Sequence, residues 1–405
     1  MTIDNYSGIS QVTFKADWTK ENNCLNPSTI SLNAKIYQFI KNFIFFVPNF
    51  IVSKLITWAV FLSSAPWVHG RMQKWANQFQ NFWEHKKHTP LWPDTPNNQK
   101  LLDTYTPIKL QLTTPDGVAI KGHFLKHKDH DANEKSRILI LLPGRGDSYQ
   151  AATHSWVMHS LQGTTLDNPT PYSILVCNLR GTHGLSGVPN QTGLTLDADT
   201  IYQFAQACNI PEHRIDIYGH SLGGGQAVQL KALHPQTGGK LLLDRTFASL
   251  DHEATYFIPK SIVNFGRHLI RSFGWELNSY KALSKIKDET HIFTHVKDAV
   301  IPESHSLGKA ILEKNPNPDT ISVHLYERCH NNPCGYSVNY HSASLHDMLL
   351  KDNHDENGSK KLFAHIFHGA PKPEIAPPIK PPVENSFVSK VSNWFKEWRS
   401  PQVAT

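Results

Sequence analysis

Short apolar runs recur through the middle of this chain, and they constrain its fold more than any other feature. Each run is long enough for a buried strand, and helix-like segments such as DADTIYQFAQACNI lie between them. The runs are RILILL (137–142), YSILVCNL (172–179), RIDIYG (214–219), KLLLD (240–244), THIFTHV (290–296) and ISVHLY (321–326). Strands that alternate with helices form a largely parallel sheet flanked by helices. The sequence therefore predicts an α/β fold.

Composition divides the 405 residues into four parts. Residues 1–100 are predicted to form a helical, apolar N-terminal extension. The main α/β domain is expected over 101–368 and opens with two alternating strands around the turn Pro115-Asp116-Gly117. A Pro-rich stretch, 369–383, has the composition of a stiff extended linker. An amphipathic helix is expected over 384–405.

Two apolar segments indicate contact with a membrane surface. The first, 36–68, is interrupted by Lys41, Pro48 and Lys54, whereas a membrane span needs about 20 predominantly apolar residues. It is typical either of a membrane-touching helical hairpin or of helices docked on the α/β domain. The Trp-rich basic helix at 384–405 is typical of an interfacial anchor, with a helix folded back on the domain as the alternative.

Charge and cysteine content bound the compartment and the partners. The formal net charge of +6 comes without a dense Lys/Arg stripe, so no nucleic-acid partner is expected. The five cysteines are odd in number and no cleavable signal peptide is visible, which argues against a disulfide framework. We expect a cytoplasmic or peripheral membrane protein, with any secretion by a non-classical route. Cys329 and Cys334 flank His330 without further ligands at suitable spacing, so no metal or cofactor is expected.

The candidate nucleophile is Ser221 in the sequence Gly219-His220-Ser221-Leu222-Gly223. A bare G-x-S-x-G match is weak, but here an apolar strand precedes it and the helix-compatible run GGQAVQLKALH follows it. Such a strand–turn–helix setting is the one in which this motif presents a serine at the end of a sheet. The glycines are needed because the serine adopts a strained backbone conformation in which neighbouring side chains would clash.

A serine hydroxyl needs a base to remove its proton, and the base needs an acid to orient it. Asp298 follows one strand and His330 follows the last strand, so both are expected at the edge of the sheet that carries the serine. Asp244, which ends the strand after Ser221, is the alternative acid. His341 and His346 lie further along the chain and are less well placed.

Two backbone N–H groups are expected to stabilise the oxyanion of the tetrahedral intermediate. One belongs to Leu222, directly after the serine. The other is assigned to Arg145 in the loop after the 137–142 strand, with Gly146 as the neighbour that could serve instead. This loop lacks the Gly-Lys-Ser/Thr ending of a phosphate-binding loop.

The order of these segments resembles the α/β-hydrolase superfamily over roughly residues 105–350. The matching segments are the Asp116-Gly117 hairpin, PGRGDS, NLRGTHGLSG, GHSLGG, KDAVIP and RCHN. The chain departs from the family where Pro143-Gly144 replaces the usual His-Gly, a change that leaves the backbone donor available. The N-terminal extension and the DRTFASL run are similar to lipases that intracellular bacteria inject into hosts.

The segment 249–289 is longer than a simple crossover and carries an apolar helical stripe, which is typical of a lid and acyl-binding wall or of an ordinary crossover helix. Together with the membrane-directed segments it favours a serine hydrolase of carboxylic ester or lipid substrates. A serine peptidase, a thioesterase, and a membrane-associated binding protein with an inactive hydrolase fold remain the alternatives.

Overall fold

The computed structural model describes residues 2–6, 9–26, 103–130, 135–144, 170–181, 185, 187, 189–253, 255, 263–272, 274–296, 298, 300–314, 320–326 and 366. The strands are β1 (Thr2–Tyr6), β2 (Ile9–Lys15), β3 (Tyr105–Thr113), β4 (Ala119–His127), β5 (Arg137–Leu142), β6 (Tyr172–Asn178), β7 (Ile215–His220), β8 (Leu241–Asp244), β9 (Thr290–His295) and β10 (Ile321–Tyr326). The α-helices are α7 (Gln191–Ala207), α8 (Leu222–Leu233), α9 (Leu250–Glu253), α10 (Val263–Ser272), α11 (Ser279–Leu283) and α12 (Leu307–Lys314). Short 3₁₀ turns are η1 (Asn23–Leu25), η4 (Glu212–Arg214) and η7 (Glu303–His305).

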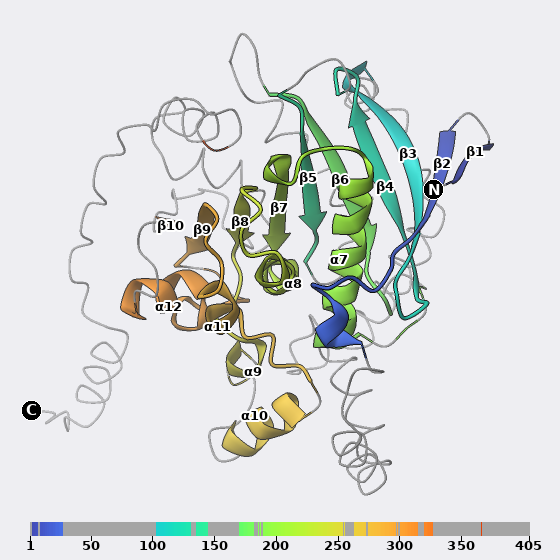
Figure 1. Cartoon of the computed structure of the whole chain (residues 1–405). Coiled ribbons are helices and arrows are strands. Elements are labelled where there is room, and N and C mark those ends of the chain that lie inside the picture. The colour runs from blue at the N-terminus through green and yellow to red at the C-terminus, as the bar shows by residue number, and fades with distance from the viewer. Residues whose placement is uncertain are drawn as a thin grey trace, which may run out of the picture.

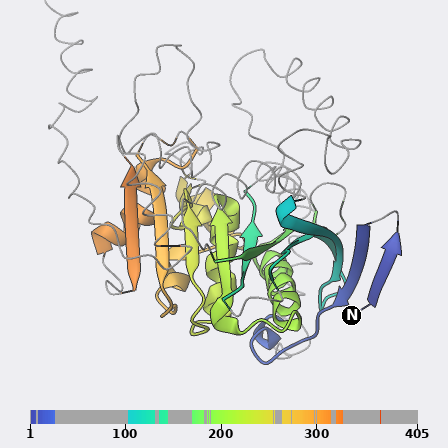
Figure 2. The same ribbon diagram turned by 90° about the horizontal axis from the view of Figure 1, so that it is seen from above.

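The strands form one sheet in the order β1-β2-β3-β4-β6-β5-β7-β8-β9-β10 (Figure 1). All pairs from β6 to β10 are parallel, as is the β2–β3 pair, while β1–β2, β3–β4 and β4–β6 are antiparallel. Figure 2 shows β1 and β2 (blue) at one end of the sheet and β10 (orange) at the other. The expected α/β fold with a mostly parallel sheet and flanking helices is confirmed.

The main hydrophobic core lies between one face of the sheet and the helices α7, α8, α11 and α12. Successive strand residues point to opposite faces, and in β5 the side chains of Ile138, Ile140 and Leu142 belong to this core. Leu139 and Leu141, between them, are also buried on the opposite face. A sheet buried on both faces explains why the strand sequences are continuous apolar runs without polar alternation.

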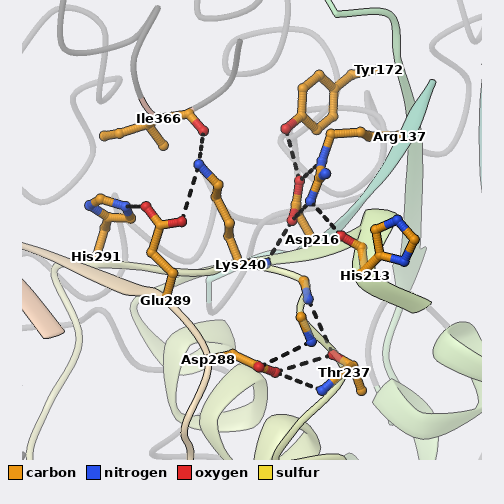
Figure 3. Close-up of polar contacts among 12 residues, drawn as sticks. Arg137, Tyr172, His213, Asp216, Thr237, Lys240, Asp288, Glu289, His291 and Ile366 are labelled. Carbon is orange, nitrogen blue, oxygen red and sulfur yellow. Dashed lines mark hydrogen bonds and ion pairs between the residues drawn. The ribbon is translucent and has the colours of Figure 1, made fainter. Parts of the chain in front are cut away.

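The amino ends of the central strands are tied together by a buried carboxylate (Figure 3). Asp216 in β7 accepts hydrogen bonds from Nε of Arg137 in β5 (2.7 Å), from the Tyr172 hydroxyl in β6 (2.8 Å) and from the Lys240 backbone N–H before β8 (2.7 Å). The ammonium group of Lys240 donates to the carbonyl oxygen of Ile366 at 2.7 Å. Because these polar groups satisfy one another, this edge of the sheet is a structural tie.

The first residues differ from the helical extension expected over 1–100. Thr2–Tyr6 and Ile9–Lys15 are strands, and β2 joins the main sheet through its parallel pairing with β3. Residues 27–100, the linker at 369–383 and the helix at 384–405 lie outside the described residues, as does the apolar stretch 36–68. In the part of the chain that is described, no helix combines the length and the hydrophobicity needed to cross a bilayer.

Candidate active site

Ser221 occupies a sharp turn between β7 and α8. Its φ of 51° and ψ of −118° place it in a region that residues with a side chain rarely adopt. Such strain persists only where the surrounding structure enforces it, and it concentrates at functional sites. Ser221 is the N-cap residue of α8, yet its side chain makes no capping hydrogen bond to the helix. The turn therefore presents the serine without using its hydroxyl to stabilise the helix.

Two glycines of the motif allow this turn to form. A Cβ atom on Gly219 would collide with the carbonyl oxygen of Gly223, and one on Gly223 would collide with the carbonyl oxygen of Leu142. Both contacts are with backbone atoms, which cannot move aside as a flexible side chain can. The same close approach brings the end of β5, and the loop that begins at Pro143, against the first turn of α8.

The turn lies where two neighbouring strands send their connections in opposite directions. β5 and β7 are adjacent and parallel, but β5 is followed by β6 on one side whereas β7 is followed by β8 on the other. Crevices at such switch points, at the carboxyl ends of the strands, are the usual binding sites of open α/β sheets. In Figure 1 β5 and β7 run downward, and α9 and α10 lie below their arrowheads. Ser221 is thus at the edge opposite the Asp216 tie.

The segment after β8 holds the backbone of the turn on both sides of Ser221. The Ser221 N–H donates to the carbonyl oxygen of Asp244 at 3.0 Å. The Thr246 hydroxyl donates to the carbonyl oxygen of Ser221 at 2.8 Å. Arg245, between these two residues, also has a positive φ of 44°. The turn at Ser221 is therefore held by hydrogen bonds with Asp244 and Thr246, the two neighbours of Arg245, and the Thr246 contact was missed by the sequence analysis.

Asp298, the expected acid, follows the carboxyl end of β9. Its carboxylate oxygen Oδ1 accepts hydrogen bonds from the N–H groups of Val300 (2.8 Å) and Ile301 (3.0 Å). Its own backbone N–H donates to the carbonyl oxygen of His295 (3.1 Å). The side chain is buried. These backbone hydrogen bonds hold the Asp298 carboxylate at the carboxyl end of the sheet.

Asp244, the alternative acid, is bound within the protein. It is buried, and it accepts hydrogen bonds from the Tyr218 hydroxyl (2.7 Å), from Nε of Arg245 (2.7 Å) and from a terminal guanidinium nitrogen of the same arginine (2.6 Å). Both carboxylate oxygens are therefore engaged in a buried ion pair that lies directly beside the Ser221 backbone.

The first residue of α8 is Leu222, the expected oxyanion donor. Its N–H makes no hydrogen bond to another described residue, as expected for the first turn of a helix. The Leu222 side chain packs with Phe247, Leu277 and Ile301 in a small apolar cluster. The other expected members of the site, His330 and Arg145, lie outside the described residues, as do Gly146, His341 and His346.

A second carboxyl group that the sequence analysis missed lies near Asp298. The Glu253 side chain is 8% exposed, and neither of its carboxylate oxygens makes a hydrogen bond to another described residue. Nδ1 of His305 lies 3.6 Å from Glu253 Oε2, and the His305 ring packs edge-on against His252. Burial, and secondarily the charge of Asp298, raises the pKa of Glu253 to about 8. Near neutral pH this side chain is therefore mostly protonated.

Within 249–289, the helices α9 and α10 are attached to each other by a charged cluster. The Asp251 carboxylate on α9 is buried and accepts hydrogen bonds from Nε of Arg267 (3.0 Å) and Nε of Arg271 (2.9 Å), one turn apart on α10. On the same helix Phe265 is 67% exposed. The attachment of α10 to α9 is therefore specific.

Arg180 forms two ion pairs within the fold. Arg180, in the NLRG turn, pairs with Asp116 of the β3–β4 turn at 2.7 Å and with Asp197 of α7 at 2.9 Å. This arginine therefore links three parts of the fold. No three metal-binding side chains converge anywhere in the described ranges.

The chain has distant relatives among known proteins, and no protein-family model matches it. It is 24% identical over 206 residues to the uncharacterized membrane protein YNL320W of Saccharomyces cerevisiae. The aligned region covers 49% of this chain and 64% of that protein. It is 28% identical over 133 residues to protein bem46 of Schizosaccharomyces pombe, covering 32% and 43% respectively. The chain thus spans less than two thirds of either relative.

The chain is also similar in fold to solved α/β hydrolases. The match to the α/β hydrolase of Vibrio vulnificus covers 59% of this chain and 80% of that hydrolase, with a TM-score of 0.43 and 19% sequence identity. The esterase Pf2001 of Pyrococcus furiosus covers 59% and 86%, with a TM-score of 0.41 and 17% identity. The acetyl xylan esterase of Paenibacillus sp. R4 covers 62% and 90%, with a TM-score of 0.39 and 18% identity.

Proposed function

We propose that the chain is a serine hydrolase that cleaves carboxylic ester or lipid substrates through Ser221, His330 and Asp298. The observation that carries this proposal is the strained backbone of Ser221 at the switch point of the sheet. Two glycines leave room for this turn, and the segment after β8 holds it in place. A serine that only connected a strand to a helix would need neither the strain nor this bracing.

In the proposed reaction, His330 removes the proton of the Ser221 hydroxyl as Oγ attacks the carbonyl carbon of the ester. The N–H groups of Leu222 and Arg145 stabilise the oxyanion, and His330 then returns the proton to the departing alcohol. Water hydrolyses the resulting acyl-enzyme by the same steps. Asp298 orients His330 and stabilises the imidazolium. The engagement of both Asp244 oxygens by Tyr218 and Arg245 favours Asp298 for this role.

The test is labelling with a fluorophosphonate probe, which forms a covalent bond only with an activated serine. Wild type is compared with S221A, H330A and D298N, and with S279A as a control at another buried serine. We expect wild type and S279A to be labelled, S221A to be unlabelled, and H330A and D298N to be labelled slowly. Folded wild type that stays unlabelled both in buffer and with liposomes would contradict the proposal and favour a binding protein with an inactive hydrolase fold.

The substrate class is tested with a panel of acyl esters of increasing chain length, acyl thioesters and aminoacyl amides. Preferential turnover of esters would support an esterase or lipase, whereas turnover of amides or thioesters would point to a peptidase or a thioesterase. Peripheral membrane contact through 36–68 or 384–405 is part of the same proposal. Flotation with liposomes of the full chain, and of chains that lack 384–405, measures it directly.

A further inference from the structure

We infer that Thr246 is a positioning residue, whose hydroxyl fixes the direction in which the Leu222 N–H points. This inference rests on the proposed function, because it assigns the Leu222 N–H to the oxyanion. Thr246 lies just after β8, and its hydroxyl hydrogen goes to the carbonyl oxygen of Ser221.

The contact between Thr246 and the turn is short and enclosed. The hydroxyl lies 2.8 Å from the Ser221 oxygen, and Thr246 is 1% exposed. A Cβ atom on Gly224 would lie 2.5 Å from Cβ of Thr246 and 2.6 Å from its hydroxyl oxygen. The threonine therefore packs directly on the first turn of α8, where only a glycine leaves room for it.

The carbonyl oxygen of Ser221 and the N–H of Leu222 belong to the same peptide group. That group is planar and trans, so its oxygen and its hydrogen point in opposite directions. The unusual ψ of Ser221, −118°, is the torsion that orients this plane. A hydrogen bond that fixes the oxygen on one side therefore fixes the oxyanion donor on the other. The N–H of Gly224 also donates to the Ser221 oxygen (3.0 Å), so the oxygen is held by two donors.

The backbone of Thr246 is in turn fixed by the chain that follows Asp298. Its carbonyl oxygen accepts a hydrogen bond from the N–H of Leu307 at 2.9 Å, and Phe247 and Ser306 form an antiparallel bridge. Thr246 thus connects the serine turn with the end of the loop that begins at the acid. Its position depends on both parts of the proposed site.

A buried threonine could instead contribute only stability, and Thr200 offers a matched control. Thr200 is fully buried in α7, and its hydroxyl donates to the carbonyl oxygen of Leu196 at 2.7 Å. A Thr→Val change removes one buried hydrogen bond of similar length at either position while keeping the side-chain shape. Only the change at 246 alters a carbonyl group whose peptide carries a proposed oxyanion donor.

The experiment compares wild type, T246V, T246S and T200V in ester hydrolysis, in fluorophosphonate labelling and in inhibition by an alkyl boronic acid that forms a tetrahedral adduct with the serine. Loss of a complete oxyanion donor typically lowers kcat about 10²–10³-fold, so a misdirected one in T246V should lower kcat roughly 10-fold. In T246V we expect KM to change little and the inhibition constant of the boronic acid to rise by about the same factor as kcat falls. T246S, which keeps the hydroxyl, should retain the wild-type values.

The outcomes separate this inference from the proposed function. Wild type that is neither labelled nor active would overturn the proposed function and this inference with it. Active wild type with an equally active T246V, or with the same loss of kcat in T200V, would overturn the role of Thr246 alone. If T246V does not fold, the pair T246A and T246S gives the same comparison. A loss in T246A that T246S does not share supports the role, and equal values contradict it.

Discussion

The guanidinium group of Arg245 binds the carboxylate of its own neighbour, Asp244, and both side chains are buried. The pair lies beside the serine turn, where the Asp244 carbonyl oxygen accepts a hydrogen bond from the N–H of Ser221. Asp244 therefore resembles a catalytic acid in the sequence, at the end of a strand beside the nucleophile, but its side chain stabilises the turn. The two aspartates that the sequence offered as triad acids consequently differ in what their loss should do.

D298N should lower mainly kcat, whereas D244N should lower mainly the free energy of unfolding. D298N should lower kcat about 10³–10⁴-fold, as when the acid of a Ser-His-Asp triad becomes an amide, and leave the free energy of unfolding nearly unchanged. D244N should lower that free energy by about 3–5 kcal/mol, because it leaves Arg245 buried without its anion. Denaturant unfolding and kcat per folded molecule measure both effects. The reverse assignment of the two effects would make Asp244 the acid.

G223A should prevent the serine turn from forming. The new methyl group would meet the carbonyl oxygen of Leu142 and would lie 2.6 Å from that of Pro143. G117A is the control, because open space surrounds Gly117 and only its positive φ of 84° opposes a side chain there. We expect G117A to cost about 1–2 kcal/mol from backbone strain alone and to be labelled normally. G223A should cost more and lose labelling, and equal costs in the two variants would contradict the steric explanation.

E253Q should remove a pH dependence of stability. The folded state keeps the proton of Glu253 up to about pH 8, whereas the unfolded chain releases it near its ordinary pKa of 4.5. Rising pH through this interval therefore favours unfolding, by up to about 1.4 kcal/mol per pH unit from this group. Wild type should lose stability from pH 6.5 to 8 more steeply than E253Q.

The pH interval is chosen because the neighbouring histidine has the opposite effect below it. Burial, and secondarily the charge of His252, lowers the pKa of His305, so its contribution to stability rises with pH up to about 6.5. Chemical denaturation at several pH values measures both slopes. Parallel curves for wild type and E253Q between pH 6.5 and 8 would show that Glu253 is ionised in the folded state.

D251N should loosen α10 without unfolding the sheet. The two arginines of α10 converge on one buried carboxylate, and the amide that replaces it carries no charge to hold them. Hydrogen exchange should become faster across Val263–Ser272 while the amides of α8 remain protected. R267Q and R271Q should each show a smaller effect. Unchanged exchange in α10 would mean that its apolar contacts, such as that of Ile270 with Trp275, hold it alone.

The sequence predicted the central sheet closely because burial on both faces leaves an unmistakable signature. RILILL is β5 residue for residue, and the other five runs match their strands to within a residue or two at their ends. The serine turn was also predictable, since glycines flank it and a strand and a helix enclose it. These features depend on local sequence.

Features that depend on distant partners were not predictable. The TIDNY and ISQVTFK segments are largely polar, and they are strands through the pairing of β1 with β2 and of β2 with β3. The hydroxyl of Thr246 bonds a carbonyl group that precedes it by 25 residues. Asp244 and Asp298 both follow apolar runs, and only the return of the Arg245 side chain onto Asp244 distinguishes them.

The parallel pairing of β2 with β3 also has a consequence for synthesis. Because a chain is synthesised from its N-terminus, β1 and β2 emerge before Tyr105–Thr113, the partner that joins them to the sheet, has been made. Until then the hairpin presents unpaired backbone edges, which are open to mispairing with other nascent chains. These two strands are thus secured only after the chain from 16 to 104 has also been made, and chaperone protection would matter most during that interval.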